Sequence, residues 1–217
     1  MPIPKHNSQS YAAYKEIKHK ILSGYFTADA RLREAEVAEL VGMSRTPVRE
    51  ALKKLEDERL LTREPKLGLV VTRHSQQDVT ELYEMREVLE GAAAAFAARH
   101  AREAEIDHME HILQLSAQPG ADAVAMNLAF HAAIYSAAHN QHLVRSLQAV
   151  TDSTYLLGRS TLQSPERAAK ALLEHRAILD AIRRHAPAEA EAAAKHHIRQ
   201  ALTERLNILR EVDATAQ

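Results

Sequence analysis

Helical periodicity runs through the last two thirds of the chain and limits the folds that are open to it. Apolar residues recur there at spacings of three and four, and no run of alternating strand character follows Ser75. Pro and Gly or polar dipeptides interrupt this pattern at four places. The helical stretches are residues 76–99, 102–117, 121–139, 141–161, 165–185 and 187–212. Helices of this length predict an antiparallel all-α bundle of about six members.

The N-terminal part of the chain has a different pattern. Helical spacing covers residues 11–24, 34–41 and 45–57, and two short β-rich runs, Leu60–Arg63 and Leu69–Thr72, then flank a Pro- and Gly-containing turn. Three helices followed by a hairpin are typical of a winged helix-turn-helix. We therefore expect a mainly α protein with a winged helix-turn-helix in residues 1–74 and an all-helical domain in residues 75–217.

Composition removes several classes of protein. The 217 residues include no cysteine, which excludes disulfide scaffolds, thiolate metal sites and cysteine nucleophiles. The longest apolar run, near residues 91–98, is far shorter than the ~20 residues of a membrane span. The first ten residues contain no apolar segment typical of a secretion signal. The sequence therefore predicts a cytoplasmic protein that does not contact a membrane.

Charge is divided unevenly along the chain. Residues 1–74 carry 14 Lys+Arg against 10 Asp+Glu, whereas the remaining residues carry 14 against 19. A positive N-terminal part indicates that this part meets a polyanion such as DNA. A solvated charged face would have the same composition. Charge alone therefore does not indicate DNA binding, whereas residues placed for base recognition do.

Such residues lie at the start of the helix expected over residues 45–57. Arg45 and Arg49 are one turn apart, on the side opposite the apolar stripe of that helix. A helix fits the major groove, and an arginine donates two hydrogen bonds to guanine. The hydroxyl groups of Ser44 and Thr46 suit phosphate oxygens. The alternative is a helix with ordinary solvated arginines.

The segment from Arg31 to Val71 closely resembles the GntR family of bacterial transcription regulators. The resemblance rests on SRTPVREAL at Ser44–Leu52 and on the glycine of the wing, Gly68. It implies base contacts from Arg45 and Arg49, phosphate contacts from Ser44 and Thr46, and a DNA contact near Lys66 and Gly68. Because one reading helix covers only a half-site, we also expect a homodimer on a pseudo-palindromic double-stranded operator.

Polar residues interrupt the apolar stripes of the helical part. Asn127 and His131 are one turn apart on one stripe, His175 occupies a core position on another, and His197 lies at the edge of a third. Three neutral imidazoles and one oxygen suit Zn²⁺, Ni²⁺ or Mn²⁺. The alternative is a set of core histidines that bond to their neighbours, since periodicity does not establish that the three meet.

Arg86 also interrupts an apolar stripe, in the first helix of the bundle. A buried guanidinium needs an anionic partner. Two partners fit: Glu90, one turn further along the same helix, or the carboxylate of a bound ligand, which arginine grips with two hydrogen bonds.

This second part resembles the FCD effector domain of FadR-type regulators, in its six-helix, VanR-like form. The matching segments are Asn127–His131, Glu174-His175-Arg-Ala-Ile and His197. The resemblance implies a divalent metal held by Asn127 and the three histidines, and an arginine such as Arg86 that holds a small organic acid with the metal. Most metal-binding members carry Asp at the first position; the Asn here binds a hard cation more weakly.

Together these observations predict a ligand-responsive DNA-binding transcription regulator, of a kind that is most often a repressor, and not an enzyme. Two alternatives stay open. A regulator could sense the metal alone, without an organic effector. A metallohydrolase could be fused to a DNA-binding domain, with Glu90 or Glu174 as the base that catalysis requires.

Overall fold

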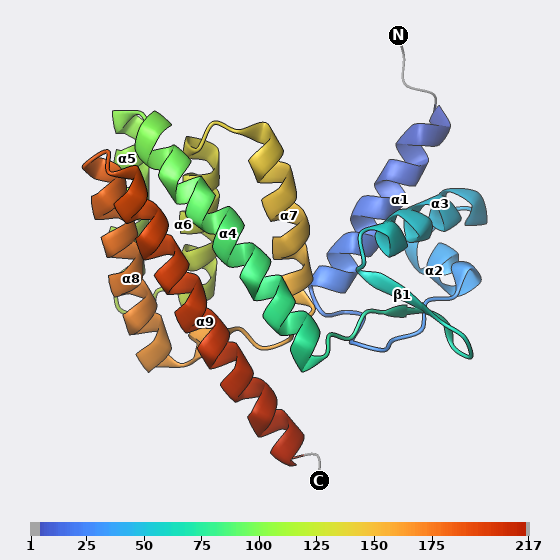
Figure 1. Cartoon of the computed structure of the whole chain (residues 1–217). Coiled ribbons are helices and arrows are strands. Elements are labelled where there is room, and N and C mark those ends of the chain that lie inside the picture. Colours follow the sequence, from blue (N-terminus) through green and yellow to red (C-terminus); the bar gives the residue numbers. More distant parts are fainter. Residues whose placement is uncertain (1–4, 216–217) are drawn as a thin grey trace. The chain divides into compact units, whose positions relative to one another are not determined.

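The computed structural model describes the backbone of residues 5–215 and the side chains of residues 9–211. Contacts between backbone segments divide this chain into two compact units (Figure 1). The N-terminal unit comprises the chain up to Ser75 together with Thr151–Gly158, and the helical unit comprises Gln76–Val150 and the chain from Arg159 onward.

The N-terminal unit is a winged helix-turn-helix, as the sequence predicts. Its elements are α1 (Lys5–Leu22), α2 (Glu34–Val41), α3 (Arg45–Asp57), β1 (Leu61–Glu64) and β2 (Gly68–Val71). The two strands are antiparallel, with Leu61 opposite Val71 and Glu64 opposite Gly68. Gly42 has φ +66°, so the turn between α2 and α3 uses the left-handed conformation that glycine adopts without strain.

Apolar side chains from every element of this unit form one core. The fully buried large side chains of this core are Ile17, Ile21, Leu55, Leu60 and Leu61.

Ser44 occupies the N-cap position of α3, but its side chain makes no capping hydrogen bond, so its hydroxyl group is not used there.

The helical unit is the expected bundle, and its helices are α4 (Gln76–His100), α5 (Glu103–Ser116), α6 (Ala123–Ala137), α7 (Gln141–Tyr155), α8 (Pro165–Arg183) and α9 (Pro187–Thr215). The last turn of α7, from Thr151, is grouped with the N-terminal unit. Figure 1 shows α4 and α9 running side by side. Gly91 lies where they approach, and a Cβ atom built there would be 2.9 Å from Cε of Lys195. The glycine therefore leaves room for the side chains of Lys195 and Glu191 on α9.

The predicted helix over residues 141–161 is too long. α7 ends at Tyr155, Gly158 takes φ +76°, and a short 3₁₀ helix covers Thr161–Gln163. Ser160 caps this short helix, and Ser164 caps α8 by accepting a hydrogen bond from the backbone N–H of Arg167. These local hydrogen bonds end the helical pattern that the apolar spacing alone suggests.

In the part of the chain that the structure describes, no helix combines the length and the apolarity needed to cross a bilayer. The core of the bundle is rich in alanine, and its largest fully buried side chains are Phe130, Ile106, Met109, Leu147, Ile178, Leu179 and Ile182.

Replacing Leu55 by Ala should lower the free energy of unfolding of the N-terminal unit by about 2–5 kcal/mol, because it empties a fully buried leucine site. The control is Leu40→Ala on α2, where the leucine is 41% exposed and the change should stay within about 0.5 kcal/mol. Chemical denaturation measures both. Equal losses in the two variants would contradict the core described above.

Candidate metal centre and nucleic-acid interface

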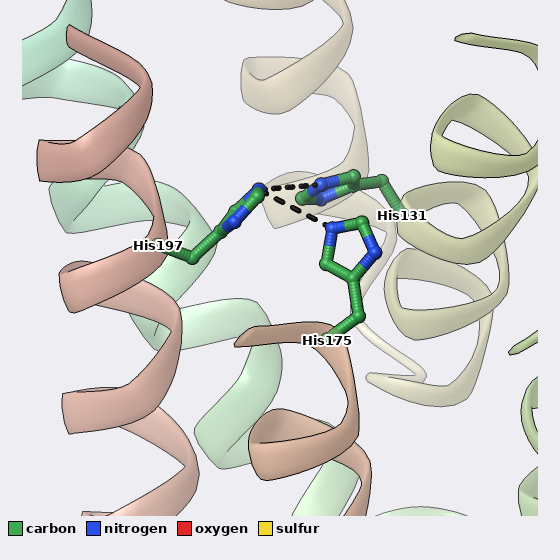
Figure 2. Close-up of side chains that lie close together, drawn as sticks. All are labelled: His131, His175 and His197. Carbon is green, nitrogen blue, oxygen red and sulfur yellow. Dashed lines mark hydrogen bonds between the residues drawn. The ribbon is translucent and has the colours of Figure 1, made fainter. Parts of the chain in front are cut away.

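Three buried histidines from three helices of the bundle point toward one another. His131 lies on α6, His175 on α8 and His197 on α9 (Figure 2). Nε2 of His197 is 3.3 Å from Nε2 of His131 and 3.3 Å from Nε2 of His175. One nitrogen from each ring lies within 4.8 Å of the other two. The structure thus brings together the three histidines that the sequence analysis singled out.

A carboxylate lies behind two of the three rings. Oε2 of Glu90 is 2.6 Å from Nδ1 of His131, and Oε2 of Glu174 is 2.6 Å from Nδ1 of His197. Burial raises the pKa of the Glu90 carboxyl, but its contacts with His131 and Arg86 outweigh burial and hold it well below the ordinary value. The pKa of Glu174 is lowered in the same way, against burial, by His197 and Arg167. Both carboxyl groups are therefore ionised.

Each carboxylate is in turn held by a buried arginine. Arg86 donates from Nε and Nη2 to Oε1 of Glu90, at 3.1 and 2.7 Å. Arg167 donates from Nη1 and Nη2 to the two oxygens of Glu174, at 2.9 and 2.8 Å. Two series of contacts, Arg86–Glu90–His131 and Arg167–Glu174–His197, thus lead to the histidine cluster. In each series the positive charge of the arginine balances the negative charge of the glutamate.

The contact with Glu174 sets the position of the hydrogen on His197. An ionised carboxylate only accepts hydrogen bonds, so Nδ1 of His197, which is hydrogen-bonded to Glu174, carries the hydrogen in the neutral ring. Nε2 of His197 then presents its lone pair at 3.3 Å from Nε2 of His131 and from Nε2 of His175. Burial lowers the pKa of His197 to about 4, although Glu174 opposes this, and burial holds the pKa of His175 well below its usual range. A lone pair directed at two further imidazole nitrogens suits a bound cation.

Asn127 was expected to complete this set. It lies on α6 one turn before His131 and is half-buried, so helical geometry places it on the same side as that histidine. Its role as an oxygen ligand stays a prediction.

Arg86 makes the ion pair that was one of the two alternatives for it. The contact with Glu90 uses Nε and Nη2, which form one edge of the guanidinium. A guanidinium has five N–H donors, so the opposite edge, formed by Nη1 and Nη2, has donors that Glu90 does not use. The Arg86 side chain is 15% exposed. The pairing with Glu90 therefore leaves a ligand contact geometrically possible.

The sequence analysis did not assign Arg167 any role, and it considered Glu90 and Glu174 without placing them behind the rings. A signal was present, since Arg167 and Glu174 are seven residues apart and share a face of α8. Ligating histidines commonly donate their second N–H to a carboxylate, so a search for acidic residues on buried faces would have found both glutamates.

The start of α3 presents its polar residues outward. Pro47 and Val48 are buried beneath this surface. At the tip of the wing, Lys66 is exposed, and Gly68 takes φ +81°, a conformation open to glycine. The exposed residues of α3 and its N-cap that were expected to contact DNA are Ser44, Arg45, Thr46 and Arg49.

A groove of about 530 Å³ lies between α2, α3 and the hairpin. Arg49 lines it and pairs there with Glu34 of α2. Four further cations line this groove and were not expected from the sequence: Arg31, Arg33, Lys53 and Arg63. Lys53 continues the helical spacing of Arg45 and Arg49 along α3, whereas the other three come from segments that share no periodic pattern with it. Five basic residues against two glutamates give the groove a positive charge suited to nucleic acid.

Comparison with known proteins agrees with both halves of this description. Residues 9–71 match the model of the bacterial regulatory proteins of the gntR family, and residues 81–200 match the FCD domain. The HTH-type transcriptional regulator YdhC of Bacillus subtilis (strain 168) is 29% identical over 191 residues, which cover 85% of this chain and 84% of YdhC.

Two further relatives extend over almost the whole chain. A protein of Paenarthrobacter nicotinovorans, named "Probable D-xylose utilization operon transcriptional repressor", is 31% identical and aligns with 91% of this chain and 89% of its own length. The structure of E. coli McbR/YncC has the same fold, with a TM-score of 0.72, 22% identity, and coverage of 94% of this chain and 97% of its own. The chain belongs to the gntR family of bacterial regulatory proteins, carries an FCD domain, and is a transcriptional regulator and not an enzyme.

Proposed function

We propose that this regulator binds a pseudo-palindromic operator as a homodimer through its N-terminal unit, and that its helical unit holds a divalent metal and a small carboxylate effector. Such a protein acts in the cytoplasm, where bacterial DNA lies. The observation that carries the effector half is the cluster of three buried histidines, His131, His175 and His197, of which one ring nitrogen each lies within 4.8 Å of the other two.

The donor set fits a borderline divalent cation. Three imidazole nitrogens, from His131, His175 and His197, with the amide oxygen of Asn127, match the ligands that Zn²⁺, Ni²⁺ and Mn²⁺ accept in proteins. Bound there, the ion would supply a positive charge and an open coordination position for an acid. Glu90 and Glu174 orient two of the rings and increase their basicity as ligands.

Untagged, gently purified protein should contain close to one metal ion per chain by elemental analysis. The double variant His131→Ala/His175→Ala should contain none, while His196→Ala, which removes an exposed neighbour of His197, should keep the metal. Glu174→Gln should weaken metal binding by about 10–100-fold, because it removes the negative charge and one of the two acceptor oxygens behind His197. Failure of the wild type to bind Zn²⁺, Ni²⁺ or Mn²⁺ after incubation would contradict the metal site.

Charge balance favours an anionic effector. The Arg86–Glu90 and Arg167–Glu174 pairs cancel, and imidazoles that ligate a metal are neutral and add no charge. Asn127 contributes no negative charge where an Asp would, so a divalent ion would carry its full charge into a buried site. Buried charge is costly unless it is paired. A carboxylate on the open metal position, held also by the unused edge of Arg86, would provide the compensation.

Replacing Arg86 by Lys keeps a positive charge beside Glu90 but removes the planar fork that grips a carboxylate. We expect this variant to keep its metal and to need at least about tenfold more carboxylate for its response, which corresponds to about 1.4 kcal/mol. The readouts are thermal stabilisation and operator release with a panel of mono-, di- and hydroxycarboxylates. An unchanged response would remove the effector role of Arg86. Operator release by metal alone, with every carboxylate inert, would favour the metal-sensing alternative.

The DNA half of the proposal rests on the exposed start of α3. Ser44, Arg45, Thr46 and Arg49 lie together there, beside a basic groove that the wing closes. The arginines would read bases, and the hydroxyl groups, with Lys66 and Gly68 of the wing, would contact the backbone. An effector changes operator affinity only as far as it binds the two states of the protein differently.

Arg49→Ala should cost about 1–3 kcal/mol of operator binding and relax the base preference at one position of each half-site. Binding titrations with operator duplexes that carry single base changes measure both effects. If the variant binds every duplex as the wild type does, α3 does not read the operator through this residue.

A further inference from the structure

Arg49 is held by a carboxylate from a different helix. Its Nε lies 3.0 Å from both oxygens of Glu34, and its Nη2 lies 2.9 Å from Oε2. Glu34 is the first residue of α2, and Arg49 is in the second turn of α3. The two side chains are 41% and 68% exposed, so this pair lies on the surface and not in the core.

The pairing uses one particular edge of the guanidinium. Glu34 contacts the side edge, formed by Nε and Nη2. The end edge, formed by Nη1 and the second hydrogen of Nη2, is the edge with which arginine spans O6 and N7 of guanine. A carboxylate on the side edge therefore fixes the direction of the end edge without competing for it.

Two physical consequences follow for a long side chain on a DNA-binding surface. An arginine has many rotamers, and a partner that holds one of them reduces the entropy lost when a base contact forms. The negative charge of Glu34 also opposes a contact between Arg49 and a phosphate. The pKa of Glu34 is lowered mainly by its hydrogen bond with Arg49, so the carboxylate is ionised and can do both.

We propose that Glu34 is a positioning residue for sequence recognition: it directs Arg49 toward a guanine edge and away from the phosphate backbone. This inference rests on the proposed operator binding by α3. It assigns to α2 a share in base selectivity, although Glu34 itself touches no base.

A general charge effect would act differently from positioning. Removing any acidic side chain near DNA strengthens binding to all sequences, because phosphate repulsion falls. Glu36 provides a matched control on the same helix. It is exposed, and it pairs with Arg33, whose Nη1 donates to Oε1 of Glu36 at 2.7 Å. Glu36→Gln and Glu34→Gln remove the same charge, but only the second weakens the contact that holds Arg49, because an amide offers one acceptor oxygen where the carboxylate offers two.

The test is a selection of bound duplexes from a random-sequence DNA pool, followed by sequencing. It uses the full chain as wild type, Arg49→Ala, Glu34→Gln and Glu36→Gln. We expect the wild type to select a motif with a guanine in each half-site whose preference disappears in Arg49→Ala. Glu34→Gln should reduce the preference for that guanine by about fivefold or more, the lower end of what a bidentate arginine–guanine contact supplies. Glu36→Gln should keep it.

The outcomes separate this inference from the proposed function. A wild type that selects no motif, or an Arg49→Ala variant that selects the wild-type motif, removes the assignment of Arg49. With that assignment intact, a Glu34→Gln variant that keeps the guanine preference as Glu36→Gln does overturns the positioning role. Uniformly stronger binding of Glu34→Gln to all duplexes, with the preference unchanged, identifies a charge effect alone and overturns it equally.

Discussion

The arrangement of the helical unit depends on buried charges that are matched in pairs. Glu90 and Glu174 lie behind the histidine rings, and an unpaired carboxylate in such a place would cost several kcal/mol. Arg86 and Arg167 provide the opposite charges. With Glu174 thus kept ionised, Nδ1 of His197 carries the hydrogen, and its Nε2 atom faces the other two histidines. The geometry of the candidate metal centre therefore follows from ion pairs one layer further out.

A carboxylate also orients a functional side chain on the DNA-facing surface, but with different physics. The Glu34–Arg49 pair is exposed, so it contributes little to the stability of the fold. The pair instead affects the orientation of Arg49. Glu34 occupies one edge of the guanidinium, so the other edge is available to a ligand. In the bundle, the same kind of contact both stabilises and orients, since water is excluded there.

Much of the fold could be predicted because apolar spacing reports which face of a helix is buried. The predicted bounds of α2 and α3 and the predicted first residues of most bundle helices lie close to the observed ones. Apolar spacing extended α7 past Tyr155 because Leu156 and Leu157 continue the apolar pattern, whereas the chain leaves the helical conformation before Gly158, which takes a left-handed φ of +76°, and Ser160 and Ser164 cap the two helices that follow. Periodicity also placed His197 at the edge of an apolar stripe, and the structure buries this residue while its neighbour His196 is exposed.

The sequence by itself determined the family, the two-part organisation, and the residue types that can bind DNA or a metal. Only the tertiary structure decided which of these residues meet. His131 and His197 are 66 residues apart, and Glu34 and Arg49 are 15 apart on different helices. A helical pattern shows that a side chain faces inward or outward, but the partner of that side chain depends on how separate helices pack. The contacts that orient both candidate sites are of this second kind.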